Sequence, residues 1–308
     1  MRVLITGAGG QIGRELVIAL YRRGDQILAT DIQPLNYSGI QTATLDVTNS
    51  QAMWEVLMDW RPQEVFHLAA YLSARSESNP YESWQVNFTA TWHLFEACLE
   101  AGVQRVFWPS SIAAFGPHTP RAQTPQYTVM DPIGIYGIAK LAGERLAEYF
   151  YLRRGLDVRS IRFPGIVGPA HLPMGGTTDF AVHMFYDALQ KGTYTCYLKP
   201  HTRLPMLYIE DAIRAILELM AAPPEALSIR GAYNIQGMSF SPAELEAEIQ
   251  KRIPHFRCVY EPDFRQALAE SWPETLDDSI ARKDWGWKPQ YDLYALCEAM
   301  WKALPLYT

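Results

Sequence analysis

Short apolar runs alternate with longer amphipathic stretches through the first half of the chain. β-Branched and apolar residues fill the short runs, whereas apolar residues in the longer stretches recur at helical spacing. Such alternation is typical of βαβ units and therefore of a parallel sheet with helices packed against it. The pattern predicts strands at 2–6, 26–31, 42–46, 64–70, 104–111 and 157–163, and helices at 11–23, 50–60, 81–101 and 136–153.

The pattern changes after Pro164, where loops rich in proline and glycine begin. Strand-like and helical patterns return at 205–220 and 232–235, followed by a helical stretch at 241–253 and an aromatic-rich tail. We therefore predict an α/β protein, a Rossmann doubly wound parallel sheet with a smaller C-terminal substrate lobe. In this interpretation the Rossmann domain contains residues 1–164 and 206–236, and the lobe contains residues 165–205 and 237–308.

Composition and charge describe an ordinary globular protein. The 308 residues are 48% apolar and 19% charged, and the formal net charge of -6 gives no reason to expect nucleic acid or an anionic membrane as a partner. The cysteines are too scattered for a disulfide framework, and the histidines show no pair at metal-ligand spacing, so no metal site is expected. The chain opens on a strand-like run and holds no apolar stretch long enough to cross a bilayer. We expect a cytoplasmic protein.

A glycine-rich turn follows the first predicted strand. Gly7, Gly10 and Gly13 have the spacing that lets the backbone turn tightly, approach a pyrophosphate and pack the next helix against the sheet. A strand precedes the turn, a helix follows it, and Asp31 ends the second predicted strand. A carboxylate there accepts hydrogen bonds from the adenosine ribose and repels a 2′-phosphate, so the sequence favours NAD over NADP. A glycine turn that binds no ligand is the alternative.

A second group of polar residues lies farther along the chain. Tyr136 and Lys140 are four positions apart at the start of a predicted helix, so they share one face. Ser111 falls at the C-terminal end of the fifth predicted strand, where open α/β sheets bind their ligands. Each residue has an ordinary explanation as a core tyrosine, a solvated lysine or a polar strand end. Together, behind a dinucleotide motif, they indicate a catalytic site.

Further motifs follow in order: "HLAA" (67–70), "VN" (86–87), "SSIAAFG" (110–116), "RFPGIVGP" (162–169) and "LYIEDAIRAI" (207–216). With these motifs the chain resembles the extended short-chain dehydrogenase/reductase family over essentially its full length. The resemblance implies that Tyr136 is the acid/base, that Lys140 holds the nicotinamide ribose and lowers the tyrosine pKa, and that Ser111 hydrogen-bonds the reacting oxygen. The expected NAD-binding residues are Gly7, Gly10, Gln11, Ile12, Gly13, Asp31, Ile32, Asp46, Val47, Leu68, Ala69, Ala70, Asn87, Tyr136, Lys140 and Pro164. Asp46 and Val47 could instead belong to the N-cap region of the next helix.

The fold does not name a reaction, because it also serves epimerases, dehydratases and reductases. Ile112 and Ala113 stand where dehydratases need an acidic pair, so dehydration is not expected. The stretch "MGGTTDF" (174–180) places glycine amides, hydroxyls and the Asp179 carboxylate side by side, an arrangement that suits a small zwitterion better than a sugar diphosphate. The alternatives are a structural glycine turn and, for Asp179, a helix N-cap.

Five segments of the second half narrow the expectation: "GGTTDFAVHMFYDAL", "RLPMLYIEDAIRA", "AYNIQGMSFSPAEL", "PDFRQALAESWP" and "DDSIARKDWGWK". They resemble a subfamily, the short-chain-type L-threonine 3-dehydrogenases. That resemblance implies oxidation of L-threonine at C3 to 2-amino-3-ketobutyrate, and a homodimer formed through helices 81–101 and 136–153. An NAD-dependent nucleotide-sugar epimerase and a non-catalytic NAD-binding sensor remain as alternatives. The expected substrate-binding residues are Ser73, Ser111, Tyr136, Gly175, Gly176, Thr177, Thr178 and Trp272, although Trp272 could equally be a core residue.

Overall fold

The structure, a computed structural model, describes residues 1–170 and 175–304. Its centre is a six-stranded parallel sheet with the strand order β3-β2-β1-β4-β5-β7. This is the Rossmann order, in which the chain starts near the middle, builds one edge and then returns to build the other. The predicted fold class is therefore confirmed. The strands are β1 (Arg2–Thr6), β2 (Gln26–Asp31), β3 (Gln41–Thr44), β4 (Glu64–His67), β5 (Arg105–Phe107) and β7 (Asp157–Arg159).

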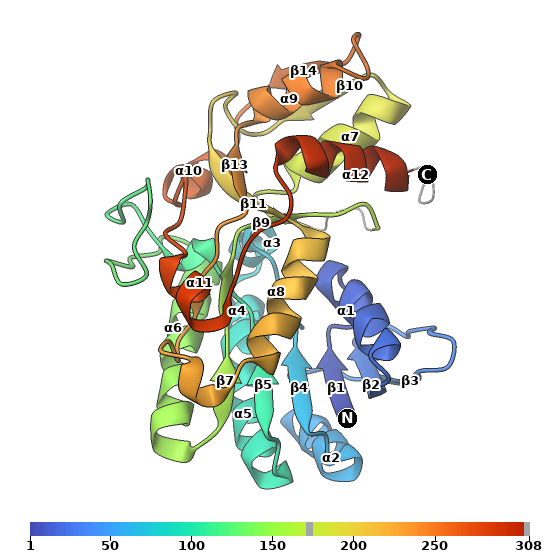
Figure 1. Ribbon diagram of the computed structural model, residues 1–308, viewed down its shortest axis with the longest axis vertical. Coiled ribbons are helices and arrows are strands. Elements are labelled where there is room, and N and C mark those ends of the chain that lie inside the picture. The colour runs from blue at the N-terminus through green and yellow to red at the C-terminus, as the bar shows by residue number, and fades with distance from the viewer. Residues whose placement is uncertain (171–174, 305–308) are drawn as a thin grey trace.

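Helices cover both faces of this sheet (Figure 1). In β1, Val3 and Ile5 join an apolar cluster with α1 and α8, whereas Leu4 joins a second cluster with α2, α5 and α6. Successive residues of a strand point to opposite faces, so a strand covered on both faces is apolar at nearly every position. The helices are α1 (Gln11–Arg22), α2 (Ser50–Trp60), α5 (Ala90–Ala101), α6 (Ile135–Tyr149) and α8 (Ile209–Ala221).

Several predicted elements are interrupted. The predicted strand 104–111 divides into β5 and β6 (Ser110–Ser111), because Pro109 has no N–H to donate to a neighbouring strand. The predicted strand 157–163 divides at Ser160 into β7 and β8 (Ile161–Phe163), and the strand predicted at 64–70 ends at His67. A separate small sheet joins β6, β8 and β12 (Tyr233–Asn234). The predicted helices 81–101 and 136–153 each contain a π turn, so the observed order is α4 (Pro80–Trp84), η1 (Gln85–Thr89) and α5 in the first, and α6 followed by η3 (Phe150–Arg154) in the second.

A buried arginine connects the edge strand β7 to helix α8. Arg159 is 2% exposed, and its Nη1 donates to the carbonyl oxygens of Leu219, Met220 and Ala222 at 2.7–3.0 Å. An α-helix leaves such C-terminal carbonyls without a donor of its own, and a positive charge there also complements the helix dipole. Asp157 balances the guanidinium at 2.7 Å. The arginine therefore fixes the end of α8 against the sheet.

The remaining elements gather above the carboxyl ends of the parallel strands (Figure 1). One small sheet contains β9 (Gly165–Val167), β11 (Leu204–Tyr208) and β13 (Met238–Phe240), and β10 (Thr193–Cys196) pairs with β14 (Arg257–Tyr260). Our division into residues 1–164 plus 206–236 and residues 165–205 plus 237–308 stays an interpretation. The other elements are α3 (Ser73–Ser78), η2 (Ile112–Ala114), α7 (Phe180–Gln190), η4 (Pro224–Ala226), α9 (Pro242–Gln250), α10 (Arg265–Glu270), α11 (Ser279–Trp285) and α12 (Leu293–Ala303).

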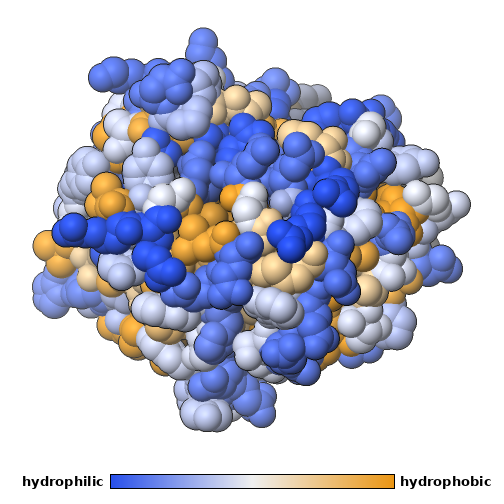
Figure 2. Space-filling model, turned by 90° about the horizontal axis from the view of Figure 1, so that it is seen from below, coloured by the Kyte–Doolittle hydropathy of each residue, from blue (hydrophilic) through white to orange (hydrophobic). Residues whose placement is uncertain are grey.

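The face at the amino ends of the strands is mostly polar, with several separate apolar patches (Figure 2). Within the described residues, every helix is too short or too polar to span a membrane.

Candidate active site

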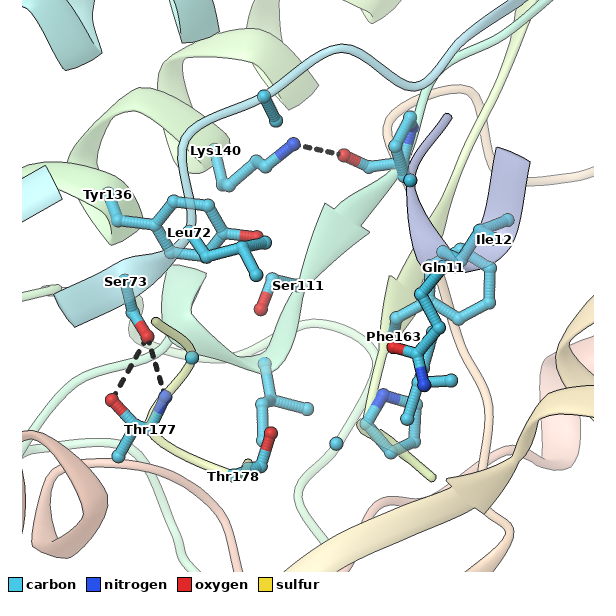
Figure 3. Close-up of a pocket in the computed structure, with 18 of the residues that line it drawn as sticks. Gln11, Ile12, Leu72, Ser73, Ser111, Tyr136, Lys140, Phe163, Thr177 and Thr178 are labelled. Carbon is cyan, nitrogen blue, oxygen red and sulfur yellow. Dashed lines mark hydrogen bonds between the residues drawn. The ribbon is translucent and has the colours of Figure 1, made fainter. Parts of the chain in front are cut away.

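A pocket opens at the carboxyl ends of the strands, between the glycine turn after β1 and the loop before α7. Ser111, Tyr136 and Lys140 meet on one side of it, and Ser73, Thr177 and Thr178 lie on another (Figure 3). The expected residues that line this pocket are Gly7, Gly10, Gln11, Ile12, Gly13, Leu68, Ala70, Ser73, Ser111, Tyr136, Lys140, Pro164, Gly176, Thr177, Thr178 and Trp272.

The other expected residues do not contribute to the pocket wall. Asp31 ends β2, and its Oδ2 accepts a hydrogen bond from the amide of Gly9 at 2.9 Å, so it holds the glycine turn. Asn87 is buried and hydrogen-bonds both backbone groups of Tyr71, so it holds the loop after β4. Contact of either residue with NAD stays a prediction, as it does for Ile32, Asp46, Val47 and Ala69. Contact of Gly175 with the substrate also stays a prediction. Met174, the first residue of "MGGTTDF", lies outside the described residues.

The glycine turn fits a dinucleotide. Gly7 has a φ of +68°, and a Cβ there would lie 2.5 Å from the amide nitrogen of Ala69. A Cβ on Gly13 would lie 2.3 Å from the carbonyl oxygen of Gly7, so helix α1 can start this close to the turn because position 13 has no side chain. Gln11, in the first turn of α1, has a buried Nε2 without a hydrogen-bond partner among the described residues. An amide donor at a helix N-terminus suits a phosphate.

The helix α6 brings the two reactive groups to Ser111. Burial raises the pKa of Tyr136 to about 12, although a hydrogen bond with Ser111 partly offsets this increase. Burial lowers the pKa of Lys140 to about 7, against the nearby Glu144 carboxylate, which raises it. The ammonium group donates to the carbonyl oxygen of Pro109 at 2.7 Å and lies 5.5 Å from the centre of the Tyr136 ring (Figure 3). A phenol, a hydroxyl and a cation thus face one point of the pocket.

The glycine loop before α7 already holds an anion of its own. The amides of Gly175 and Gly176 donate to Oδ2 of Asp179 at 3.0 and 2.6 Å. Burial raises the pKa of Asp179 to about 6, against the two amides, which lower it. Asp179 stands at the N-cap of α7 but makes no side-chain cap hydrogen bond. The amides that we expected to hold a substrate carboxylate are therefore engaged by the protein's own carboxylate.

Ser73 and Thr177 join that loop to the first turn of α3. The Thr177 amide donates to Oγ of Ser73 at 3.0 Å, and the two hydroxyl groups lie 3.0 Å apart (Figure 3). Thr177 is 1% exposed, so protein atoms surround its side chain almost completely. Trp272 follows α10, lines the pocket and is also part of the apolar core, and its contact with a substrate stays a prediction.

The glycine turn between β1 and α1 lies within a longer match, in which residues 3–235 fit one family of known proteins. The chain belongs to the NAD dependent epimerase/dehydratase family. Membership confirms NAD as the expected cofactor.

Relatives and solved structures within this family resemble the chain along its whole length. The L-threonine 3-dehydrogenase, mitochondrial, of Sus scrofa is 45% identical over 312 residues, covering 97% of this chain and 81% of that protein. The holo form of a GalE-like L-threonine dehydrogenase from Cupriavidus necator has a TM-score of 0.95 at 45% identity, covering 98% of this chain and 99% of that one. The apo form of a monomeric L-threonine 3-dehydrogenase from a metagenome database has a TM-score of 0.95 at 40% identity, covering 99% and 100%. Since one neighbour is monomeric, the homodimer expected for this epimerase/dehydratase family member stays a prediction.

Sequence reasoning missed two charged residues at this site. Arg75 lines the pocket, and its guanidinium lies 3.9 Å from the centre of the Tyr71 ring. Because Arg75 comes only two residues after Ser73, an expected substrate-binding residue, the sequence could have suggested that it lines the site. Glu144 is buried next to Lys140, and its spacing of four residues from Lys140 repeats the spacing of Lys140 from Tyr136.

Proposed function

We propose that this protein oxidises L-threonine at C3 with NAD, giving 2-amino-3-ketobutyrate. The observation that carries the proposal is that Ser111, Tyr136 and Lys140 line the same pocket as loop residues 176–178. Relatives that cover the chain almost completely and are named L-threonine dehydrogenases support it.

In this proposal, Tyr136 acts as a phenolate that accepts the proton of the substrate's side-chain hydroxyl. Bound NAD supplies the hydride acceptor. Ser111 donates a hydrogen bond to the reacting oxygen, and Lys140 supplies positive charge beside the phenol. Lowering a free phenol from a pKa of about 10 to about 7 needs about 4 kcal/mol of preferential stabilisation of the phenolate. Burial of Tyr136 increases that requirement, so the charge on Lys140 is central to the chemistry.

A zwitterionic substrate suits the charges around the glycine loop. Both amides bond Oδ2 of Asp179, which leaves Oδ1 as the acceptor for an ammonium group. The Thr178 hydroxyl and the Arg75 guanidinium belong to the same pocket wall and would serve the carboxylate. A sugar diphosphate would bring at least two negative charges toward the buried carboxylate of Asp179, which disfavours it.

The decisive assay follows NADH formation by absorbance with NAD and L-threonine, alongside NADP, L-serine, D-threonine and a UDP-sugar. Reduction of NAD with L-threonine and not with D-threonine is the expected result. If no NADH forms with L-threonine but the UDP-sugar is converted, the protein is an epimerase and the proposal is wrong. NAD binding without turnover of any substrate would indicate a sensor.

Replacing Asp31 by alanine is expected to raise the KM for NAD roughly 10- to 100-fold, because hydrogen bonds to a charged group contribute about 1.5–3 kcal/mol. The preference for NAD over NADP should also narrow, since the repulsion of a 2′-phosphate is lost. Steady-state kinetics with NAD and with NADP measures both the KM for NAD and the preference between the two cofactors. Asp59→Ala is the control, since Asp59 is exposed on α2 and lies outside the pocket. Equal effects of the two substitutions would contradict a specific role for Asp31.

Replacing Thr177 by valine is expected to raise the KM for L-threonine about 2- to 10-fold, the range for one lost hydrogen bond. The substitution keeps the shape of the side chain and removes the hydroxyl that contacts Ser73, so the loop loses a link to α3. Thr202→Val is the matched control, because the Thr202 hydroxyl is also buried but bonds Gln266 away from the pocket. A KM that stays at the wild-type value would exclude a role for this hydroxyl in substrate binding.

A further inference from the structure

Helix α6 directs three side chains, each four residues apart, at one short stretch of chain. Tyr136 hydrogen-bonds Ser111, Lys140 donates to the carbonyl oxygen of Pro109 at 2.7 Å, and Oε1 of Glu144 accepts from the Ser110 hydroxyl at 2.6 Å. Residues at this spacing share one face of a helix. The three contacts set the register between α6 and the strand that carries Ser111.

Glu144 is also held from the opposite side. It is 0% exposed, and Arg162 in β8 donates to it through Nε at 2.9 Å and through Nη2 at 2.8 Å. Arg162 in turn donates from Nη1 to the carbonyl oxygen of Gln126 and to Oδ1 of Asn234, both at 2.9 Å. The carboxylate therefore has one fixed position. Because β8 pairs with β6, the same ion pair also ties these two strands to the helix.

A buried ion pair by itself is weak evidence for a gain in stability, because removing two charges from water costs about as much as their attraction returns. The position of Glu144 suggests a different benefit. Its charge opposes the effect of burial on Lys140 and raises the pKa of that lysine. Without a nearby anion, burial would favour the neutral amine.

Few other charges face Lys140 in the described part of the chain. His67 in β4 is kept neutral, because burial and Lys140 itself lower its pKa to about 3. Tyr136 is on the same helix, and the Trp108 ring lies 4.6 Å from the ammonium nitrogen. Arg162 lies on the other side of Glu144, and Arg145 reaches Glu144 from the surface at 3.9 Å. Glu144 is therefore the anion that balances Lys140.

We propose that Glu144 is a positioning residue, which sets Ser110 and Ser111 in register with Tyr136 and supplies negative charge that favours the ammonium form of Lys140. The proposal rests on the proposed acid/base role of Tyr136. Glu144 touches neither substrate nor reacting atoms in this account and acts through Lys140 and Ser111.

The test is Glu144→Gln, which keeps an acceptor for Ser110 and removes the charge. Less negative charge lowers the pKa of Lys140, a neutral Lys140 no longer stabilises the phenolate, and Tyr136 then needs a higher pH to ionise. We expect the acidic limb of the kcat profile to move up by about one pH unit, with roughly tenfold lower kcat near neutral pH and recovery at higher pH. Glu148→Gln is the matched control, because Glu148 lies one turn further along α6 and pairs with Arg145 at the surface.

Two outcomes would overturn the proposal: an unmoved pH profile in folded Glu144→Gln, or an equal shift in Glu148→Gln. If Glu144→Gln does not fold, Ser110→Ala tests the register alone, with several-fold lower kcat expected and wild-type kcat contradicting it. Ultraviolet difference spectra of phenolate formation, wild type minus Tyr136→Phe, need no turnover. They separate a failure of this proposal from a failure of the proposed substrate, since Glu144→Gln should move that titration to higher pH whichever substrate the protein uses.

Discussion

Replacing Tyr136 by phenylalanine is expected to lower kcat for L-threonine oxidation by about 10²–10⁴-fold, the usual contribution of a positioned acid/base group. The change removes one oxygen atom and leaves the ring in place, so the pocket keeps its shape. NAD binding should lose no more than the contribution of one hydrogen bond, about 0.5–1.5 kcal/mol, because the glycine turn lies elsewhere in the pocket. Measured kcat and an independent NAD titration separate the two effects.

Tyr127→Phe is the control for that experiment, since Tyr127 is 75% exposed and lies outside the pocket. It should behave as the wild type. Near-normal turnover by Tyr136→Phe would mean that another group removes the proton, and the assignment of the acid/base would be wrong.

Replacing Lys140 by methionine is expected to lower kcat on the order of 10²–10³-fold near neutral pH, as for other fixed groups that stabilise developing charge. Methionine fills a similar volume but carries no charge, and the bond to the Pro109 carbonyl is lost. Only the hydrogen bond with Ser111 then opposes the effect of burial on the phenol, so the pKa of Tyr136 stays raised. The residual activity should therefore climb with pH over a range in which the wild type has reached its plateau.

The pH profile of kcat for Lys140→Met distinguishes the loss of phenolate stabilisation from a loss of folding. A uniform decrease at every pH, with a lowered melting temperature, would indicate that Lys140 serves the structure rather than the ionisation of Tyr136. Lys191→Met provides the comparison, because that lysine is exposed at the surface and pairs with Asp187 on its own helix.

The repeating pattern of strands and helices was sufficient to predict the Rossmann sheet, because burial on both faces leaves a strong apolar signal in each strand. The interruption at Pro109 could have been predicted as well, since proline cannot donate to a ladder. The π turns at Gln85–Thr89 and Phe150–Arg154 could not, because one extra residue in a helical turn barely changes the apolar spacing.

The residues of the candidate site also fall into two groups, those that local sequence features indicate and those that depend on the fold. Ser111, Tyr136 and Lys140 were found because their spacing and their place at strand and helix ends are local features of the chain. The hydrogen bonds of Asp179 to its own glycine loop depend on how three residues fold back, which composition does not show. The environment of Glu144 depends on Arg162 and Asn234, which the fold brings from distant parts of the sequence.

The contact between Arg159 and the end of α8 has a consequence for how the protein is made. The carbonyl groups that receive this guanidinium lie about sixty residues further along the chain. At a synthesis rate of roughly 5–20 residues per second, they leave the ribosome about 3–12 s after the arginine. Until then the edge of the nascent sheet carries a cation with half of its hydrogen bonds missing. The first 164 residues are therefore a poor candidate for a fragment that folds alone, and the sheet reaches its final packing late in translation.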